Sequence, residues 1–419
     1  MINSFSYLFL LAILLSTGVK LWLATRQISA VRRHRNQVPA AFEEDISLEA
    51  HKKAADYTAA KMKHARITAL VDTVLLIVLT FGGLLNWCYS LAQDWSSSYI
   101  LSGLIFFGLI TVISSVLQLP FDIYKTFVLE EKFGFNKMTP GLFLKDFFLG
   151  LTVSAIIGSI FISLILWIME TSGSYWWINA WLLSIAFWFF MQYISPSVVA
   201  PLFNKFSPLE NESLKDRIES LLKKCGFQSS GLFVMDGSKR SSHGNAYFTG
   251  FGKTKRIVFF DTLISRHEPN EIEAVLAHEL GHFKLRHVQK LSIFLAASGF
   301  LFFWLLGVIQ ETSFMHEGMN IAFFDSNAML LAMFYFVLPP FLFFVRPMLA
   351  AYLRKNEFEA DEYASRHAPA RDLIAALVKL YKDNSSTLTP DKVYSSFYDS
   401  HPGAMARINR LESLAAQTN

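Results

Sequence analysis

Residues 271–290 read EIEAVLAHELGHFKLRHVQK, and the centre of this stretch, His278-Glu279-Leu280-Gly281-His282, has the pattern HExxH. Two histidines four residues apart lie one turn above the other on the same face of a helix. Two neutral imidazoles in that arrangement can bind one Zn²⁺ ion and leave room for a water molecule and a further ligand. Glu279, about 100° further round the helix, would lie beside that water and could accept its proton. The alternative is a chance match on an ordinary surface helix.

The residues around the motif predict a well-defined helix. Asn270 is the expected N-cap, and Glu273, three residues later, would complete a capping box. Ile272, Val275 and Leu276 would form a short apolar face that packs the helix against the rest of the protein.

The composition indicates a membrane protein. Hydrophobic residues make up 53% of the 419 residues, charged residues only 17%, and 40 residues are Phe. The expected surroundings are therefore a lipid bilayer, and two or three soluble domains are not expected. The net charge of +4 is small, and no nucleic-acid partner is expected. Cys88 lies in an apolar run and Cys225 in a polar one, so neither a disulfide nor a thiolate metal site is expected.

Seven apolar segments are long enough, or nearly long enough, to span a bilayer: about 5–24, 67–91, 99–120, 146–169, 176–199, 291–310 and 327–349. The first has no basic residues before it, so we expect a membrane anchor and not a cleaved signal peptide. No Lys or Arg occurs in 67–124, 146–204 or 291–345, whereas every second connection is basic. The positive-inside rule then predicts an outside N-terminus and a cytosolic C-terminus.

The polar segment 200–290 predicts a small α+β unit. Its expected elements are a helix capped by Ser213 and ending at Gly226, a strand at Leu232–Met235, and a hairpin of Asn245–Phe248 and Arg256–Phe260 around the Gly250–Gly252 turn region. Helices are expected at about 350–367, 370–382 and 403–416. We therefore expect an N-terminal membrane region at 1–199, a cytosolic metalloprotease segment at 200–290, two spans at 291–349 and C-terminal cytosolic helices at 350–419.

A catalytic zinc usually has three protein ligands, so one is still needed. On a continuous helix His287 would point away from His278 and His282. The helix after the last span, AYLRKNEFEADEYASRH, is a better source because its spacing places Glu357 and Asp361 on an otherwise apolar face. Buried carboxylates need a partner. A metal ion would provide one; a salt bridge from Glu357 to an arginine is the alternative.

The other acids of this helix, Glu359 and Glu362, fall on its opposite face together with Lys355 and Arg366. This face is charged, and we expect it to be exposed to water.

Several blocks of sequence occur in a characteristic order: Val38-Pro39, Lys53-Ala54-Ala55-Asp56-Tyr57, LPFDIYKTFVLEEKFGFNKMT at 119–139, VVAPLFNKFSPLE at 198–210, SSHGNAYFTGFGKTKRIVFFDTL at 241–263, HELGH, NEFEAD at 356–361 and SHP at 400–402. In these blocks the chain resembles the type I CAAX prenyl endopeptidases, which are integral-membrane zinc metalloproteases. The resemblance implies one Zn²⁺ per chain, bound by His278, His282 and Glu357, with Glu279 as the general base.

The resemblance also implies roles around the metal. Asp361 would orient a ligand histidine or donate a proton, and His401 would stabilise the oxyanion; a turn histidine before Pro402 is the alternative for His401. Arg407 is expected at the substrate site, paired with carboxylates there. The remaining expectation concerns the strand residues Asn245, Ala246 and Tyr247, which would line the substrate cleft and pair with an extended peptide, although an ordinary hairpin strand is the alternative.

The implied fold is mostly α: seven transmembrane helices around a large internal chamber, with a cytosolic zincin-like α+β metalloprotease unit. The implied reaction is hydrolysis of a peptide bond, as in the removal of the last three residues of prenylated CAAX proteins. The substrate would be a peptide or protein, with or without a prenyl group. Because the chain lacks the long loops of eukaryotic members and ends in AAQTN, we expect a bacterial inner membrane, with the endoplasmic reticulum as the alternative.

Three other functions fit the same residues. A quality-control protease that degrades damaged or stalled membrane proteins would share the chemistry and differ in its substrate. A transporter or channel would use zinc as a structural clip, although a closed structural site has four protein ligands. Intramembrane proteolysis would place the motif within a span, where Glu271, Lys284 and Lys290 make it costly.

Overall fold

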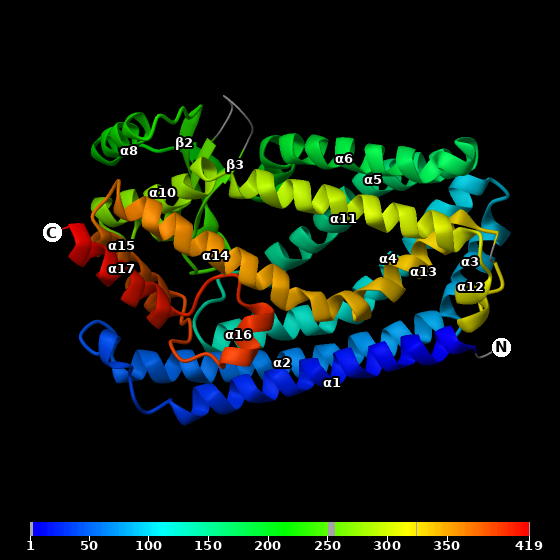
Figure 1. Ribbon diagram of the computed structural model, residues 1–419, viewed down its shortest axis with the longest axis horizontal. Coiled ribbons are helices and arrows are strands. Elements are labelled where there is room, and N and C mark those ends of the chain that lie inside the picture. Colours follow the sequence, from blue (N-terminus) through cyan, green and yellow to red (C-terminus); the bar gives the residue numbers. More distant parts are fainter. Residues whose placement is uncertain (1–2, 250–255, 324, 419) are drawn as a thin grey trace.

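The computed structural model describes residues 3–249, 256–323 and 325–418. Long helices run side by side along most of the molecule, and a small sheet with its own helices occupies one end (Figure 1). The C-terminus lies at this sheet-bearing end and the N-terminus lies at the opposite end. The molecule therefore has a membrane part and a sheet-bearing unit, arranged end to end.

The membrane part is built from eight helices: α1 (Ser4–Arg33), α2 (Leu48–Thr80), α3 (Leu84–Trp95), α4 (Tyr99–Tyr124), α5 (Pro140–Thr171), α6 (Trp176–Ile194), α11 (His287–Gln310) and α13 (Asn327–Leu342). Six helical stretches among the described residues are long and apolar enough to cross a bilayer. A seventh span results if α2 and α3, bent by 56°, count as one. The predicted span 67–91 is therefore broken, at Gly83, whose φ of 78° suits glycine.

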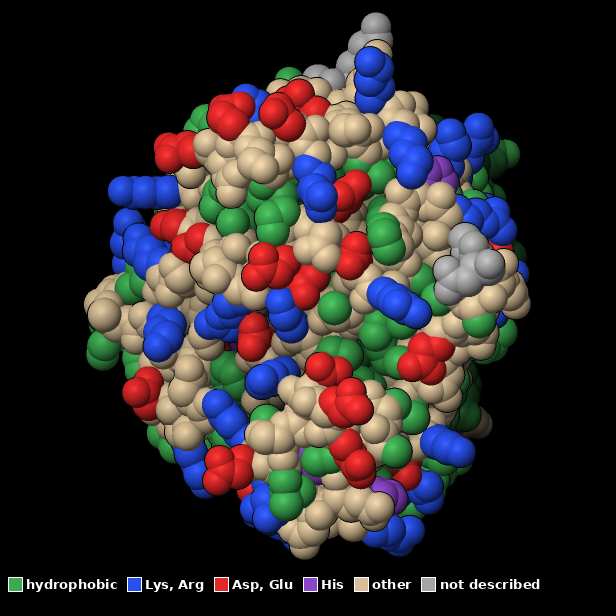
Figure 2. Space-filling view, turned by 90° about the vertical axis from the view of Figure 1, so that its left-hand side faces the viewer, with side chains coloured by type: hydrophobic (Ala, Val, Ile, Leu, Met, Phe, Trp, Pro, Cys, Tyr) green, Lys and Arg blue, Asp and Glu red, His purple; other side chains and the backbone are tan. Residues whose placement is uncertain are grey.

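The outer surface of the long helices is apolar. Leu14, Phe148 and Ile293 are between 62% and 71% exposed, which suits contact with lipid chains and not with water. Where the helices meet, Phe9, Phe106 and other large side chains are fully buried. The sheet-bearing end differs, because Figure 2 shows acidic and basic side chains spread over its surface.

Short elements connect the long helices and the strands: η1 (Ala40–Phe42), η2 (Lys125–Glu130), η3 (Gly173–Tyr175), η4 (Ser195–Val199), α7 (Ala200–Phe203), η5 (Gly237–Lys239), α9 (Asp261–Ile264), α12 (Phe314–Gly318) and η7 (Phe343–Val345). Two of them, η2 and η4, are π-helical turns that continue α4 and α6.

The sheet has four strands in the order β1-β2-β4-β3: β1 (Phe206–Pro208), β2 (Gly231–Met235), β3 (Ala246–Thr249) and β4 (Arg256–Phe260). β2 and β4 are parallel, whereas β3 runs antiparallel to β4 with Ala246 opposite Phe259. The predicted antiparallel pair is confirmed; its turn region Gly250–Gly252 lies outside the described residues. Among the described strands β3 pairs only with β4, so its other edge is open.

Six helices complete the sheet-bearing unit: α8 (Glu212–Lys224), α10 (Pro269–Lys284), α14 (Arg346–Ser365), α15 (Ala370–Asp383), α16 (Lys392–Tyr398) and α17 (Ala404–Thr418). Buried Ile218, Phe259, Leu276, Leu373 and Ile408 form one core between these helices and the sheet. The short helix α16 is absent from the sequence prediction.

The predicted cap of the HExxH helix is wrong. Helix α10 begins earlier, because Pro269 occupies its first position, where a missing N–H costs nothing. Glu268 is the N-cap and Glu271 completes the capping box, whereas Asn270 donates to Asp372 at 2.7 Å. Glu273 forms an ion pair with Arg217 at 3.4 Å instead. The predicted cap of α8 is also wrong, since Asn211, and not Ser213, caps that helix.

Helices α10 and α14 approach each other closely at Gly281, inside the motif. A methyl group at position 281 would lie 3.0 Å from the Cα of Ala360 and 3.1 Å from the Cβ of Tyr363. Only glycine permits this contact without a shift of one helix. The close contact positions Glu357 of α14 opposite the two histidines of α10.

Candidate metal centre

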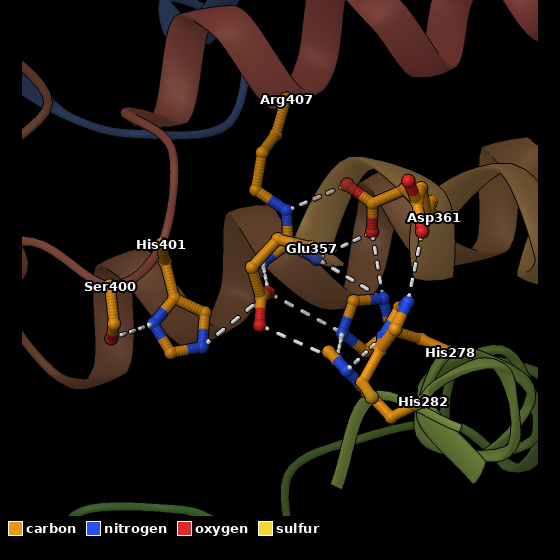
Figure 3. A network of polar contacts seen from close by, with 9 residues as sticks. His278, His282, Glu357, Asp361, Ser400, His401 and Arg407 are labelled. Carbon is orange, nitrogen blue, oxygen red and sulfur yellow. Dashed lines mark hydrogen bonds and ion pairs between the residues drawn. The ribbon is translucent and has the colours of Figure 1, made fainter. Parts of the chain in front are cut away.

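His278 and His282 of α10 and Glu357 of α14 meet in one place. Their ligand atoms all lie within 4.8 Å of one another. The two Nε2 atoms are 3.2 Å apart, and the Glu357 carboxylate lies 3.5 Å from Nε2 of His278 and 3.4 Å from Nε2 of His282. Figure 3 shows the Glu357 carboxylate between His401 on one side and the two ligand histidines on the other.

His278 is held from behind by Asp361. Its Nδ1 lies 2.8 Å from Oδ1 of Asp361, whose side chain is fully buried. Arg407 donates from Nε to the other carboxylate oxygen at 2.9 Å. Burial disfavours the charged form of His278, but hydrogen bonds to Asp361 and Glu357 raise the pKa of its imidazole to about 9. With Nδ1 occupied, Nε2 remains for a metal.

Arg407 is buried with Asp361, and this pairing raises the pKa of its guanidinium against the effect of burial. Its Nη1 also lies 3.7 Å from Glu357. Glu357 therefore lies near an arginine, the alternative partner expected from the sequence, as well as near the two histidines. The geometry suits the expected pairing with site carboxylates. It leaves little of Arg407 for a substrate, because the side chain is only 6% exposed.

The expectation that His287 points away from the motif is wrong. Helix α10 ends at Lys284, and Arg286 adopts a left-handed conformation with φ of 60°, so the chain turns before α11 begins. Nδ1 of His287 therefore lies 3.0 Å from Nδ1 of His282. Nε2 of His287 lies 3.0 Å from Glu359, an acid expected on a water-exposed face.

These residues fit a metal ion. Oε2 of Glu357 is a buried atom without a hydrogen-bond partner among the described residues. Its contacts to Nε2 of His278 and Nε2 of His401 are 3.5 Å long, too long for a direct hydrogen bond, and a buried carboxylate oxygen without a direct bond is unfavourable. Both histidines use Nδ1 for a neighbour and turn Nε2 toward Glu357. Two imidazoles and one carboxylate are a ligand set that catalytic zinc ions use.

The centre opens into a cavity of about 780 Å³. Glu279, next to His278, lines this cavity, as does His401. Nε2 of His401 lies 3.5 Å from Glu357, and its Nδ1 lies 3.0 Å from the Ser400 hydroxyl (Figure 3). The general base and the oxyanion donor expected from the sequence are therefore on the cavity side of the candidate metal position.

The expected substrate strand is divided between two faces. Asn245 and Ala246 line the cavity beside His278 and Glu279. Tyr247 faces the other side of the sheet, where its ring packs edge-on against Phe260. Ala246 and Tyr247 are successive residues of β3 and therefore point to opposite faces, whereas Asn245 precedes the strand. The open edge of β3 thus borders the cavity, which is where an extended peptide could pair with it.

Sequence reasoning missed two groups at this site. The His287–Glu359 pair depends on the turn at Arg286, and its one signal in the sequence is a further histidine close behind HExxH. The second group is on α2, far away in the sequence, where Tyr57, Thr58 and Lys61 line the cavity. Only the packing of α2 beside the sheet-bearing unit reveals it.

The long apolar helices and the His-His-Glu cluster beside the cavity define the class of integral-membrane metallopeptidases. A family model described as CAAX prenyl protease N-terminal, five membrane helices, matches residues 27–205, and one described as peptidase family M48 matches residues 208–415. The chain belongs to the CAAX prenyl protease family within peptidase family M48. It is a membrane metalloprotease of the CAAX-protease type.

Its relatives match along almost their whole length. A CAAX prenyl protease 1 homolog of Arabidopsis thaliana is 34% identical, with 95% of each chain covered. The homolog of Homo sapiens is 33% identical over 96% of this chain and 94% of its own. The crystal structure of S. mikatae Ste24p superposes with a TM-score of 0.91 at 30% identity, over 98% of this chain and 100% of that one. The predicted fold and enzyme classes are confirmed, and a transporter or channel is not supported.

Proposed function

We propose that the metal is one Zn²⁺ ion per chain, bound by Nε2 of His278, Nε2 of His282 and the Glu357 carboxylate. The observation that carries this proposal is the convergence of these atoms within 4.8 Å, around a buried Glu357 oxygen that has no hydrogen bond to any residue the structure describes. A bound zinc ion supplies a Lewis acid that lowers the pKa of a coordinated water.

The roles of the surrounding side chains follow from their positions. Glu279, on the cavity wall beside His278, takes a proton from the attacking water and passes it to the leaving amine. His401 donates a hydrogen bond to the substrate carbonyl oxygen as negative charge develops on it. Asp361 keeps His278 in the tautomer that presents Nε2, and Arg407 balances the Asp361 charge.

The proposed substrate is a protein or peptide whose extended segment pairs with the open edge of β3 at Asn245 and Ala246. The relatives are named CAAX prenyl proteases, which supports cleavage near the C-terminus of a CAAX-type sequence with or without a prenyl group. The experiment compares purified protein on a prenylated CAAX peptide, on the same peptide without the lipid, and on an unfolded segment lacking the motif.

The three peptides distinguish a CAAX-type protease from a quality-control protease. Cleavage of the CAAX peptides that stops with a chelator and returns with Zn²⁺ supports the proposal. Preference for the prenylated peptide would assign the lipid as part of the substrate. Equal cleavage of the unrelated unfolded segment would instead favour a quality-control protease, and no chelator-sensitive cleavage at all would refute the proposed activity.

We also propose that the protease segment at 200–290 and the C-terminal helices at 350–419 face the cytosol, with the N-terminus outside. The support is the alternation of basic and uncharged connections. We further propose a bacterial inner membrane as the location, with the endoplasmic reticulum membrane as the alternative. Labelling of single introduced cysteines in intact cells tests this orientation: residues near 40 should be protected and residues near 173 should react with an impermeant reagent.

A further inference from the structure

A lysine ammonium on α2 lies at the wall of the active-site cavity without a carboxylate partner. Lys61 lines the same cavity as His278 and Glu279. Its Nζ lies 4.1 Å from the centre of the Tyr57 ring, a cation–π contact that offsets only part of the cost of partial burial. None of the ion pairs within the described ranges includes Lys61. The cavity therefore contains a half-buried cation available to an anionic ligand.

The acid whose negative charge acts on Lys61 does not line the cavity. Glu130, whose charge reaches Lys61, accepts a hydrogen bond from the Tyr57 hydroxyl at 2.7 Å. Its other oxygen lies 3.7 Å from Nε2 of His243. Glu130 is not among the residues that line the cavity, whereas Lys61, Tyr57 and His243 are. The cavity wall here therefore presents an ammonium, with the compensating acid behind it.

The direction of β3 would bring the C-terminal end of a bound peptide to the part of the cavity that Lys61 lines. β3 runs from Ala246 to Thr249 and its free edge borders the cavity. A bound peptide is expected to run antiparallel to β3, because this pairing is the more stable one. Its C-terminal end then extends past Asn245 toward His243. His243, Gly244 and Asn245 line the cavity together with Lys61, and Gly244 is held by a hydrogen bond from its N–H to Asn384 at 3.2 Å.

We propose that Lys61 binds the free α-carboxylate at the C-terminus of the substrate. This inference rests on the proposed peptidase function and adds to it a specificity-determining contact. A carboxylate held at Lys61 would set the distance between the chain end and the metal, so cleavage would occur a fixed, short number of residues from the C-terminus. The enzyme would then select substrates by the position of their chain end as well as by their side chains.

The test uses two peptides of one CAAX-type sequence, one ending in a free acid and one in a carboxamide. It uses the zinc-loaded wild-type protein and three variants. Lys61→Met removes the charge and keeps the packing of the stem, and Lys61→Arg keeps the charge. Lys63→Met is the matched control, because Lys63 is exposed on the same helix and does not line the cavity.

The wild-type protein should have a kcat/KM about 10- to 100-fold higher for the acid than for the amide, as expected for a charge-assisted hydrogen bond. Lys61→Met should lower kcat/KM for the acid to the level of the amide and leave the amide unchanged. Lys61→Arg should keep most of the preference, and Lys63→Met should match the wild type.

Two results would overturn the inference while the proposed function stands: equal cleavage of acid and amide by the wild type, or an equal loss on both peptides in Lys61→Met. If the wild-type protein cleaves neither peptide, the proposed function is refuted. In that case the affinities of the zinc-loaded protein for the two fluorescently labelled peptides decide the inference, and equal affinities would refute it.

Discussion

Nδ1 of His282 lies 3.0 Å from Nδ1 of His287, and the far nitrogen of His287 lies 3.0 Å from Glu359. If Nε2 of His282 binds a metal, its Nδ1 carries the proton and donates it to His287. His287 is then neutral, accepts at Nδ1 and donates from Nε2 to the Glu359 carboxylate. Each ligand histidine thus has its own support: Asp361 with Arg407 for His278, and His287 with Glu359 for His282.

We predict that His287→Ala weakens zinc binding about 10- to 100-fold, because His282 loses the acceptor that fixes its tautomer and ring orientation. Competition with a chromophoric chelator measures the affinity without reference to activity. Glu359→Gln should have a smaller effect in the same direction. Glu362→Gln on the same helix is the control, since Glu362 pairs with Arg366 and Arg410 and not with the site. Unchanged affinity in His287→Ala would contradict the assigned role.

Glu279→Gln should retain zinc and fold but lower kcat about 10²- to 10⁴-fold, because an amide cannot take the proton of the attacking water. Bound zinc, measured by elemental analysis, should stay at one per chain. The control is Glu273→Gln, which changes an acid on the same helix that pairs with Arg217. A Glu279→Gln protein that cleaves peptide at the wild-type rate would require another general base.

Arg407→Met should destabilise the protein by about 3–5 kcal/mol, because it leaves the fully buried Asp361 without its arginine. The double variant Arg407→Met with Asp361→Asn should regain part of this loss, since it removes the buried charge that has lost its arginine. Arg410→Met on the same helix removes an exposed pair with Glu362 and should cost less than about 1 kcal/mol. Thermal unfolding in detergent orders the three variants. Equal destabilisation by Arg407→Met and Arg410→Met would show that the buried pair contributes no more to stability than the exposed pair.

Zinc binding should release protons. The pKa of His278 in the metal-free protein is raised to about 9, so at pH 7.5 this imidazole holds a proton that zinc must displace. Apparent affinity should therefore rise with pH until about pH 9. Calorimetric titration in buffers of different ionisation enthalpy counts the protons, and about one per zinc is expected from His278. A buffer-independent binding enthalpy at pH 7.5 would rule this out.

The raised pKa of His278 also determines how the stability of the metal-free protein depends on pH. Because the folded pKa of His278 lies above its ordinary value of 6.5, the protonated imidazole stabilises the fold fully below about pH 6.5. This contribution is lost as the pH rises through 9. Asp361→Asn should reduce the pH dependence of unfolding in that window, since Asp361 is one of the two carboxylates that raise the pKa.

Local patterns in the sequence were sufficient for much of the architecture. The spacing of His278 and His282 placed both on one face of α10, and the spacing of Glu357 and Asp361 placed both on the buried face of α14. The apolar segments predicted seven spans, of which six are single stretches and one is a bent pair. These features follow from the helical period and from the thickness of a bilayer, both of which act within a few turns of chain.

The sequence by itself determined which residues share a helix face and which segments are apolar enough to enter a membrane. The tertiary structure decided the rest: the left-handed Arg286 that returns His287 to His282, the choice of Asp361 as the main carboxylate partner of Arg407, and the position of Lys61 at the cavity. Arginine has no preference for a left-handed backbone, so composition does not predict that turn. The other two features bring together residues that are far apart along the chain. They depend on how whole helices pack, and no local sequence pattern predicts them.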